Sequence, residues 1–262
     1  MGIDPNRPSA ARVYDAFLGG RHNFAADRVV ATRAVELVPD LPRIARANRA
    51  FLHRAVRYAL SLGIDQFLDL GSGIPTEGNV HEVAQQIDPA ARIAYVDIDP
   101  TAVLYAQDLL AGNPHAVVVR GDLRDPETVL AGHPLREVLD LSRPVAVLMV
   151  AVLHFTPDSP GLTAALRGYR AAVAPGSLLA ISHATSSGTD PHAVERVADL
   201  YNRTGTPLAL RSREQVAGLF EGWELVEPGL VYGPEWRPDP AEPVVRDPAR
   251  LLTLAGVGIA RD

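Results

Sequence analysis

The chain has 262 residues, of which 47% are hydrophobic and 21% charged, and its formal net charge is −6. This balance suits one large α/β domain, and the negative charge argues against broad nucleic-acid binding. The absence of Cys excludes disulfides, thiolate metal ligands and a cysteine nucleophile. No apolar run is long enough to cross a bilayer, and the first residues lack a secretory pattern, so we expect a cytoplasmic protein without a membrane partner.

The charges are unevenly spread along the chain. Every basic residue is Arg, and residues 1–60 hold ten of them against five Asp and Glu. One interpretation is the Arg usage of a GC-rich genome. The other is that the Arg-rich residues 1–60 face an anionic ligand or the acidic remainder of the chain.

Three helices are predicted before the first strand. Ser9 can cap the first helix, which ends at Gly19-Gly20. The second helix runs from about 25 to 38, where prolines follow, and the third from about 43 to 62. Residues 1–63 are therefore expected to form a helical lid or extra layer on a compact unit of residues 64–262.

From residue 64 onward, predicted strands alternate with predicted helices, which indicates a parallel sheet. Two further strands follow the last helix. Strands are expected near 66–70, 92–97, 115–120, 144–151, 177–183, 223–226 and 252–260. Helices are expected near 77–87, 100–111, 126–140, 159–174, 190–203 and 213–220. The Pro-rich segment 228–249 is expected to be a surface loop, with Trp236 exposed.

A glycine turn follows the first predicted strand, as Asp69-Leu70-Gly71-Ser72-Gly73. Two glycines let the backbone turn sharply and approach a ligand closely, at the strand end where doubly wound folds bind ligands. A dinucleotide fingerprint would place a third Gly at residue 76, which is Thr76 here. This difference disfavours a nicotinamide-dependent oxidoreductase.

Acidic residues follow three consecutive predicted strands: Asp69, Asp97 and Asp122. Each one alone is explained by a helix cap or a turn. The carboxyl ends of neighbouring parallel strands share one edge, where such carboxylates can accept hydrogen bonds from ribose hydroxyls and an adenine amino group. Together they favour a nucleoside site.

These motifs resemble those of the class I S-adenosylmethionine-dependent methyltransferases. The matching strings are Phe67 to Gly73, Val96 to Pro100, Gly121 to Leu123, and Val147 to Phe155. More narrowly, the whole chain resembles an actinobacterial S-adenosyl methyltransferase family, formerly a domain of unknown function. That likeness rests on Arg12 to Asp15, Leu18 to Gly20, Asn23 to Asp27, Ala47 to Leu52, Pro75-Thr76, Gly78 to Glu82, and Leu153 to Phe155. It implies an α/β, Rossmann-like, seven-stranded sheet, mostly parallel with one antiparallel strand, with helices on both faces and the helical lid.

The resemblance also implies a set of residues around S-adenosylmethionine. Asp69, Gly71, Ser72 and Gly73 would shape the pocket for its amino-acid end, and Asp97 would hold the ribose. The adenine would meet Asp122, Leu123 and Ile98. Val150 and Ala151 would lie near the sulfonium, and Tyr14 and Asn48 from the lid could close over the methionine carboxylate or the acceptor.

The chain lacks the Asn/Asp-Pro-Pro-aromatic string of nucleic-acid and amide methyltransferases and has Ala151 to Phe155 instead. We therefore expect a small-molecule acceptor. His154 is the candidate base, with hydrogen bonding to the cofactor or capping of its loop as the alternative. His81, His183 and Arg49 are candidate substrate contacts, each with a structural role as the alternative, and Arg12 and Arg21 are expected to be solvated.

No residue spacing supports a metal site, so none is expected. The favoured function is direct methyl transfer from S-adenosylmethionine to a small molecule. The alternative is a non-catalytic protein that binds the nucleoside and regulates something else, because no residue is a certain base. A homodimer is one possible assembly.

Overall fold

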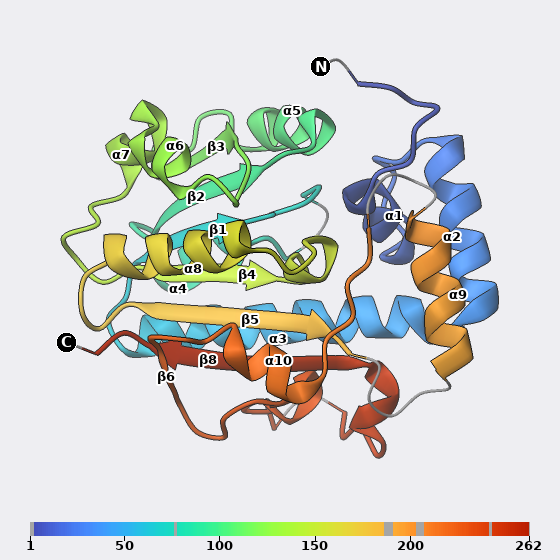
Figure 1. The fold of residues 1–262 in the computed structure, drawn as a ribbon. Helices are drawn as coiled ribbons and strands as arrows, with labels where there is room; N and C mark the ends of the chain where they lie inside the picture. The colour runs from blue at the N-terminus through green and yellow to red at the C-terminus, as the bar shows by residue number, and fades with distance from the viewer. Residues whose placement is uncertain (1–2, 76–77, 186–190, 203–206, 241–242, 262) are drawn as a thin grey trace.

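The fold is an eight-stranded mixed sheet between two layers of helices (Figure 1). The computed structural model describes residues 3–75, 78–185, 191–202, 207–240 and 243–261. The strand order is β3-β2-β1-β4-β5-β8-β6, and β7 also pairs with β8. The strands are β1 (Gln66–Leu70), β2 (Arg92–Asp97), β3 (Ala116–Arg120), β4 (Ala146–Val150), β5 (Leu178–Ala184), β6 (Glu224–Leu225), β7 (Val231–Tyr232) and β8 (Thr253–Ile259).

The predicted fold class is confirmed. Strands β1 to β5 are parallel to one another, whereas β8 runs antiparallel to β5, β6 and β7. Strand β1 is buried along its whole length, as its apolar sequence predicts for a central strand covered on both faces. The short strand β7 was not predicted, because its two residues lie within the Pro-rich segment.

Helices cover both faces of the sheet. One face packs on α3 (Leu41–Ser61), α4 (Val80–Ile87) and α5 (Pro100–Leu109). The other packs on α6 (Pro126–Ala131), α7 (His133–Val138), α8 (Pro160–Ala172) and α10 (Arg213–Gly218). The single helix predicted over 126–140 is two helices that meet at Gly132. Glu77, the predicted first residue of the helix that is α4, lies outside the described residues with Thr76 before it, as do residues 190 and 203, the two ends of the predicted helix 190–203.

The lid differs from the predicted three-helix layer. Helices α1 (Ala10–Phe17) and α2 (Ala25–Leu37) share a small core with α9 (Pro191–Asn202), which comes from the second half of the chain. Figure 1 shows these three helices side by side, next to the sheet. Helix α3 belongs to both cores: its start, with Ala45, packs in this small core, and the rest packs on the sheet. We call α1, α2 and α9 the lid below, and the division at residue 63 stays a prediction.

A buried arginine fastens the lid to the body, so the expectation that Arg12 is solvated is wrong. Its side chain is 4% exposed, and Nε donates to Asp27 Oδ2 at 2.9 Å. Nη1 donates to Thr101 Oγ1 at 3.2 Å and lies 3.6 Å from Asp99 Oδ2. Because Asp99 and Thr101 begin α5, this cluster joins α1 and α2 to the rim of the sheet.

Trp236 is fully buried, which contradicts the predicted exposure. Its indole packs edge-on against Phe51 and Tyr58 of α3, with ring centroids 5.4 and 5.7 Å away. Arg54 on the same helix donates to the carbonyls of Trp236 at 2.9 Å and Gly233 at 2.8 Å. The Pro-rich segment therefore packs onto α3. Of its residues, 241–242 lie outside the described part of the chain.

Candidate active site

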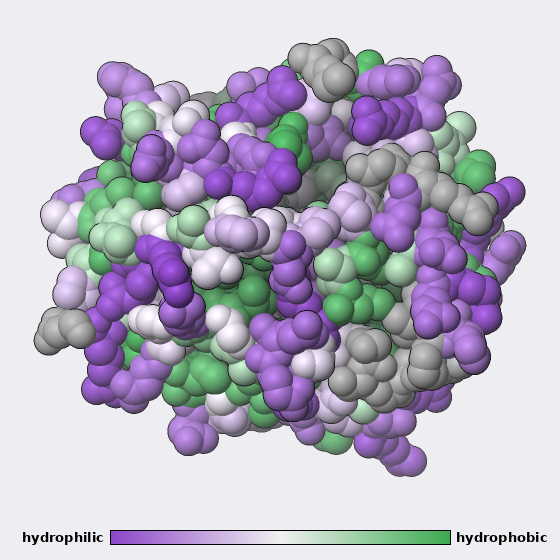
Figure 2. Space-filling view, in the orientation of Figure 1, coloured by the Kyte–Doolittle hydropathy of each residue, from purple (hydrophilic) through white to green (hydrophobic). Residues whose placement is uncertain are grey.

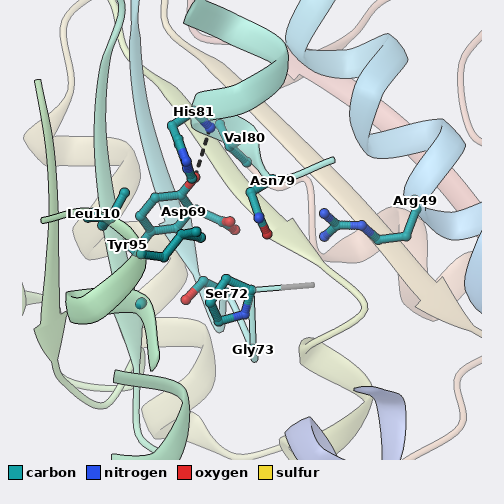
Figure 3. A pocket seen from close by; sticks show the side chains of 12 residues that line it. Arg49, Asp69, Ser72, Gly73, Asn79, Val80, His81, Tyr95 and Leu110 are labelled. Atoms are coloured by element: carbon teal, nitrogen blue, oxygen red, sulfur yellow. Dashed lines mark hydrogen bonds between the residues drawn. The ribbon is translucent and has the colours of Figure 1, made fainter. Parts of the chain in front are cut away.

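The strand order reverses between β1 and β4, and doubly wound sheets bind their ligands at that point. A pocket lies beside this point, between the end of β1, the glycine turn, α4, β2 and α5 (Figure 3). It is lined by Arg49, Asp69, Ser72, Gly73, Pro75, Asn79, Val80, His81, Tyr95, Ala106, Leu109 and Leu110. Figure 2 shows a recess on the same side, between the strand ends and the lid.

The glycine turn needs both of its glycines. Gly71 has φ 74° and Gly73 has φ 68°, in the left-handed region that favours glycine. The Gly71 amide donates to Val96 O at 2.8 Å, which ties the turn to β2. A Cβ on Gly71 would lie 2.2 Å from Val152, whereas a Cβ on Gly73 would meet no atom within 4 Å. Gly71 therefore allows close packing inside the protein, and Gly73 presents bare backbone to open space.

Asp97 and Asp69 bring two buried carboxylates to this turn. Asp97 accepts hydrogen bonds from the Gly73 amide at 2.7 Å and the Asp99 amide at 2.8 Å. Burial nevertheless raises the pKa of Asp97 to about 6, because desolvation outweighs these hydrogen bonds. Burial also raises the pKa of Asp69 to about 7, with Arg49 opposing and Asp97 reinforcing the shift. Without a ligand, the hydrogen bonds and charges around both carboxylates therefore do not offset the desolvation of their ionised forms.

The third acid stands apart from this pair. Asp122 follows β3 on the neighbouring strand end, since the Gly121 amide donates to Asp97 O at 3.0 Å. Its carboxylate is bound by the backbone and side chain of Arg124, and that hydrogen bonding lowers its pKa. Asp122 does not line the pocket of Figure 3. Ile98, directly after Asp97, is 57% exposed and presents an apolar surface at the same rim.

The start of α4 forms another wall of the pocket. Tyr95 Oη accepts from the His81 amide at 2.8 Å and lies 2.7 Å from His81 Nδ1 (Figure 3). Tyr95 thus joins the backbone and the ring of His81, and burial lowers the pKa of His81. The buried Asn79 Nδ2 has no hydrogen-bond partner among the described residues. Arg49 reaches in from α3 on the opposite side and donates to Gly78 O at 2.6 Å.

The predicted lid residues Tyr14 and Asn48 are joined to the end of β4 by a hydrogen-bonded chain. Asn48 Nδ2 donates to Tyr14 Oη at 2.9 Å, and Asn48 Oδ1 accepts from Ser182 Oγ. Ser182 Oγ in turn accepts from the Ala151 amide at 2.9 Å. Ala151 has φ 57°, a left-handed conformation that is uncommon for a residue with a side chain. These hydrogen bonds between Tyr14, Asn48, Ser182 and Ala151 thus hold the turn after Val150 in a defined shape.

His154 and His183 lie together beneath the loop after β4, with ring centroids 5.5 Å apart. Burial lowers the pKa of His183 to about 4 and that of His154 well below its usual range. His154 Nδ1 accepts from the Ala184 amide at 3.3 Å, and His183 Nε2 lies 2.6 Å from Arg211 Nη1. Neither ring lines the pocket of Figure 3.

Sequence reasoning missed Asn79, Tyr95, Ser182 and Arg211. A usable signal exists for Asn79, because Asn followed three residues later by Glu82 is the pattern of a helix start. Tyr95 and Ser182 sit within buried strands, where only the three-dimensional neighbours reveal a polar role. Among the described residues, no group of three His, Asp or Glu could hold a metal ion. No helix in the described part of the chain is long and apolar enough to cross a membrane.

The site suits a nucleoside with an amino-acid tail. Gly73 presents bare backbone to open space, and the exposed Ile98 offers an apolar face at the same rim. Asp97 can accept hydrogen bonds from hydroxyls, and the unpartnered Asn79 amide can donate to a carboxylate. These donors, acceptors and spaces match S-adenosylmethionine.

Comparison with known families agrees. The S-adenosyl methyltransferase family model matches residues 1–261. The chain belongs to this family. It is therefore an S-adenosylmethionine-dependent methyltransferase, as the sequence motifs predict.

Two solved structures are similar over nearly the whole chain. One is a candidate methyltransferase from Thermobifida fusca, with 42% identity over 98% of this chain and 96% of that one, and a TM-score of 0.91. The other is a DUF574 family protein from Streptomyces avermitilis, with 37% identity over 99% and 100%, and a TM-score of 0.92. No curated protein matches.

A more distant structure shares only the fold. It is the N-methyltransferase NodS from Bradyrhizobium japonicum, solved with S-adenosyl-L-homocysteine. It has 14% identity over 84% of this chain and 88% of that one, with a TM-score of 0.51.

Proposed function

We propose that this methyltransferase acts on a small molecule and holds its cofactor across the carboxyl ends of β1 and β2. The observation that carries the proposal is the turn of bare backbone at Gly73, hydrogen-bonded to the buried carboxylate of Asp97 at the point where strand order reverses. Asp69 and Gly73 line the pocket, and Asp97 lies behind the turn, bonded to the Gly73 amide, without lining the pocket itself. This arrangement can accept the ribose hydroxyls at one end and leave the amino-acid tail beside Arg49 and Asn79.

The remaining predicted residues take places around this centre. Asp97 binds the ribose, and Ile98 packs against the adenine with Leu123 behind it. To accept a hydrogen bond from the adenine amino group, Asp122 gives up hydrogen bonds that it now accepts from Arg124. Gly71, Ser72 and Gly73 approach the cofactor through the backbone. Val150 and Ala151 border the sulfonium, in a turn that Asn48 and Tyr14 hold through Ser182.

When bound, S-adenosylmethionine supplies an already activated methyl group. The protein then mainly aligns the acceptor, and it needs a base only when the acceptor must lose a proton. His154 remains our candidate for contact with the acceptor. Its Nδ1 accepts from Ala184, so its neutral ring carries the proton on Nε2 and can donate a hydrogen bond. To act as a base, it would first have to give up the bond from Ala184.

Calorimetry with S-adenosylmethionine tests the cofactor site. We expect micromolar binding to the wild-type protein and loss of that binding in Asp97→Ala. Asp108→Ala, which removes an exposed carboxylate from α5, is the matched control and should bind normally. Equal affinity of Asp97→Ala and wild type would contradict the proposed ribose contact.

Incubation with methyl-labelled cofactor and a metabolite extract of the host cell tests catalysis. A labelled small-molecule product is expected. Intact cofactor binding without any labelled product would instead favour a binding or regulatory protein. A cytoplasmic location and a homodimeric state stay predictions, which cell fractionation and light scattering can check.

A further inference from the structure

The loop of residues 151–158, between β4 and α8, borders the reversal point of the sheet. It begins with the left-handed Ala151 and contains a short 3-10 turn, Leu153–Phe155, which carries His154. If the cofactor site is as proposed above, this loop lies next to the reactive methyl group. Its shape then decides how an acceptor is aligned.

One buried side chain holds this loop at three points. Arg211 is 1% exposed and comes from the segment before α10. Its guanidinium donates to Leu153 O at 2.9 Å, to Thr156 O at 2.8 Å and to Asp158 Oδ1 at 2.6 and 2.9 Å. A planar fork with five donors can bind several acceptors in fixed directions, which an ammonium group cannot do.

The same guanidinium also fixes the proton position of His183. Arg211 Nη1 lies 2.6 Å from His183 Nε2, and His183 Nδ1 lies 2.7 Å from Ala184 O. Since Arg211 can only donate, Nε2 is the acceptor and Nδ1 carries the proton of a neutral ring. The Ala184 amide then donates to His154 Nδ1, which leaves the His154 proton on Nε2. Arg211 thereby sets the donor and acceptor pattern of His183, and the Ala184 amide sets that of His154.

The ion pair alone gives little reason for this arginine. Its one carboxylate partner, Asp158, has a side chain that is 66% exposed, whereas the guanidinium is almost fully buried. An apolar side chain of similar volume often serves a buried position as well as a buried ion pair does. The planar guanidinium adds hydrogen bonds of fixed direction, because its N–H groups bind the loop carbonyls and His183 from one plane.

We infer that Arg211 is a positioning residue for methyl transfer, which holds the 151–158 loop, with the His154 that it carries, and the neutral His183 beneath it in the geometry that the acceptor meets. This inference rests on the proposed function for its catalytic consequence. Its structural part, the neutral state and proton position of His183, can be tested without any acceptor.

The first test uses ¹⁵N NMR of the histidine side chains. In the wild type, His183 should stay neutral with the proton on Nδ1 from pH 8 down to about pH 5, since burial lowers its pKa to about 4. Arg211→Lys should change the His183 signals. A wild-type His183 that is protonated at pH 6, or that carries its proton on Nε2, would overturn the inference whatever the protein transfers.

The second test compares cofactor binding with transfer of label into the metabolite extract. For Arg211→Lys we expect a dissociation constant within about twofold of wild type and a transfer rate about tenfold to a hundredfold lower, because misplacement by an ångström has effects of that size. Arg213→Lys, on the same segment but bonded to Leu230 O, should change neither. Arg211→Lys with wild-type transfer would overturn the inference.

Two further outcomes can be told apart: an Arg211→Lys variant that does not fold, and a wild type that does not bind the cofactor. If Arg211→Lys does not fold, Asp158→Asn replaces it, because that variant leaves Arg211 and its carbonyl bonds in place. It should weaken transfer less than about tenfold and keep the His183 signals of the wild type. Loss of the His183 Nδ1 proton in Asp158→Asn would contradict Arg211 as its cause. If the wild-type protein does not bind S-adenosylmethionine, the proposed function is wrong. The NMR measurement still tests whether Arg211 sets the proton position of His183, because it needs no cofactor.

Discussion

At the scale of single residues, the site is built from carboxylates that the protein alone leaves poorly compensated. Asp69 lines the pocket and Asp97 is bonded to the turn beside it; each is 6% exposed, and burial raises both of their pKa values. A group whose pKa is higher in the folded protein than in the unfolded chain binds its proton more tightly when folded. Its contribution to stability is therefore present at low pH and is lost as pH rises through the folded pKa.

Without cofactor, the free energy of unfolding should fall between pH 5 and pH 8, across the pKa values of about 6 and about 7. Asp69→Asn removes one of these ionisations and should reduce that fall by roughly 2–4 kcal/mol. Urea unfolding at the two pH values measures it. Asp108→Asn, on the exposed side of α5, should keep the wild-type fall. An identical pH dependence in Asp69→Asn and wild type would show that Asp69 does not titrate in this range.

At the scale of elements, the glycine turn and the lid attachment illustrate what a sequence pattern reveals and what it hides. The turn was predicted because glycines after a buried strand have few other uses. The pattern alone did not show that Gly71 serves packing against Val152 while Gly73 faces open space.

Gly73→Ala should leave the protein folded but weaken binding of S-adenosylmethionine by about tenfold or more, because the new methyl group enters the cofactor's space. Its backbone strain is on the order of 1 kcal/mol. Gly63→Ala is the control, since Gly63 also has positive φ and an open Cβ position but ends α3. It should lose similar stability and bind the cofactor normally. Equal binding by both variants would place the cofactor elsewhere.

The attachment of the lid depends on Arg12. Arg12→Met should destabilise the protein by about 3 kcal/mol, because Asp27 and Asp99 would keep buried charges without their partner. Hydrogen exchange should become faster in α1 and α2 than in the sheet. Arg33→Met, on the exposed face of α2, should change stability by less than about 0.5 kcal/mol. Unchanged exchange in α1 would mean that apolar packing alone holds the lid.

At the scale of the whole molecule, the sequence predicts the sheet well and the surroundings of the site less completely. The central strands are apolar runs that alternate with helices, so their existence and parallel order follow from local pattern. Trp236 and Arg12 were misplaced because their burial depends on partners far along the chain, Arg54 and Asp99 among them. The same reason explains why α9 was not assigned to the lid and why Arg211 was missed.

The most direct measurement is a crystal structure of the protein with S-adenosyl-L-homocysteine. The account predicts that the ribose hydroxyls donate to Asp97, that the homocysteine tail passes Gly73 toward Arg49 and Asn79, and that the sulfur faces the loop after β4. A ligand bound away from the carboxyl ends of β1 and β2, with Asp97 still bonded only to backbone amides, would contradict it.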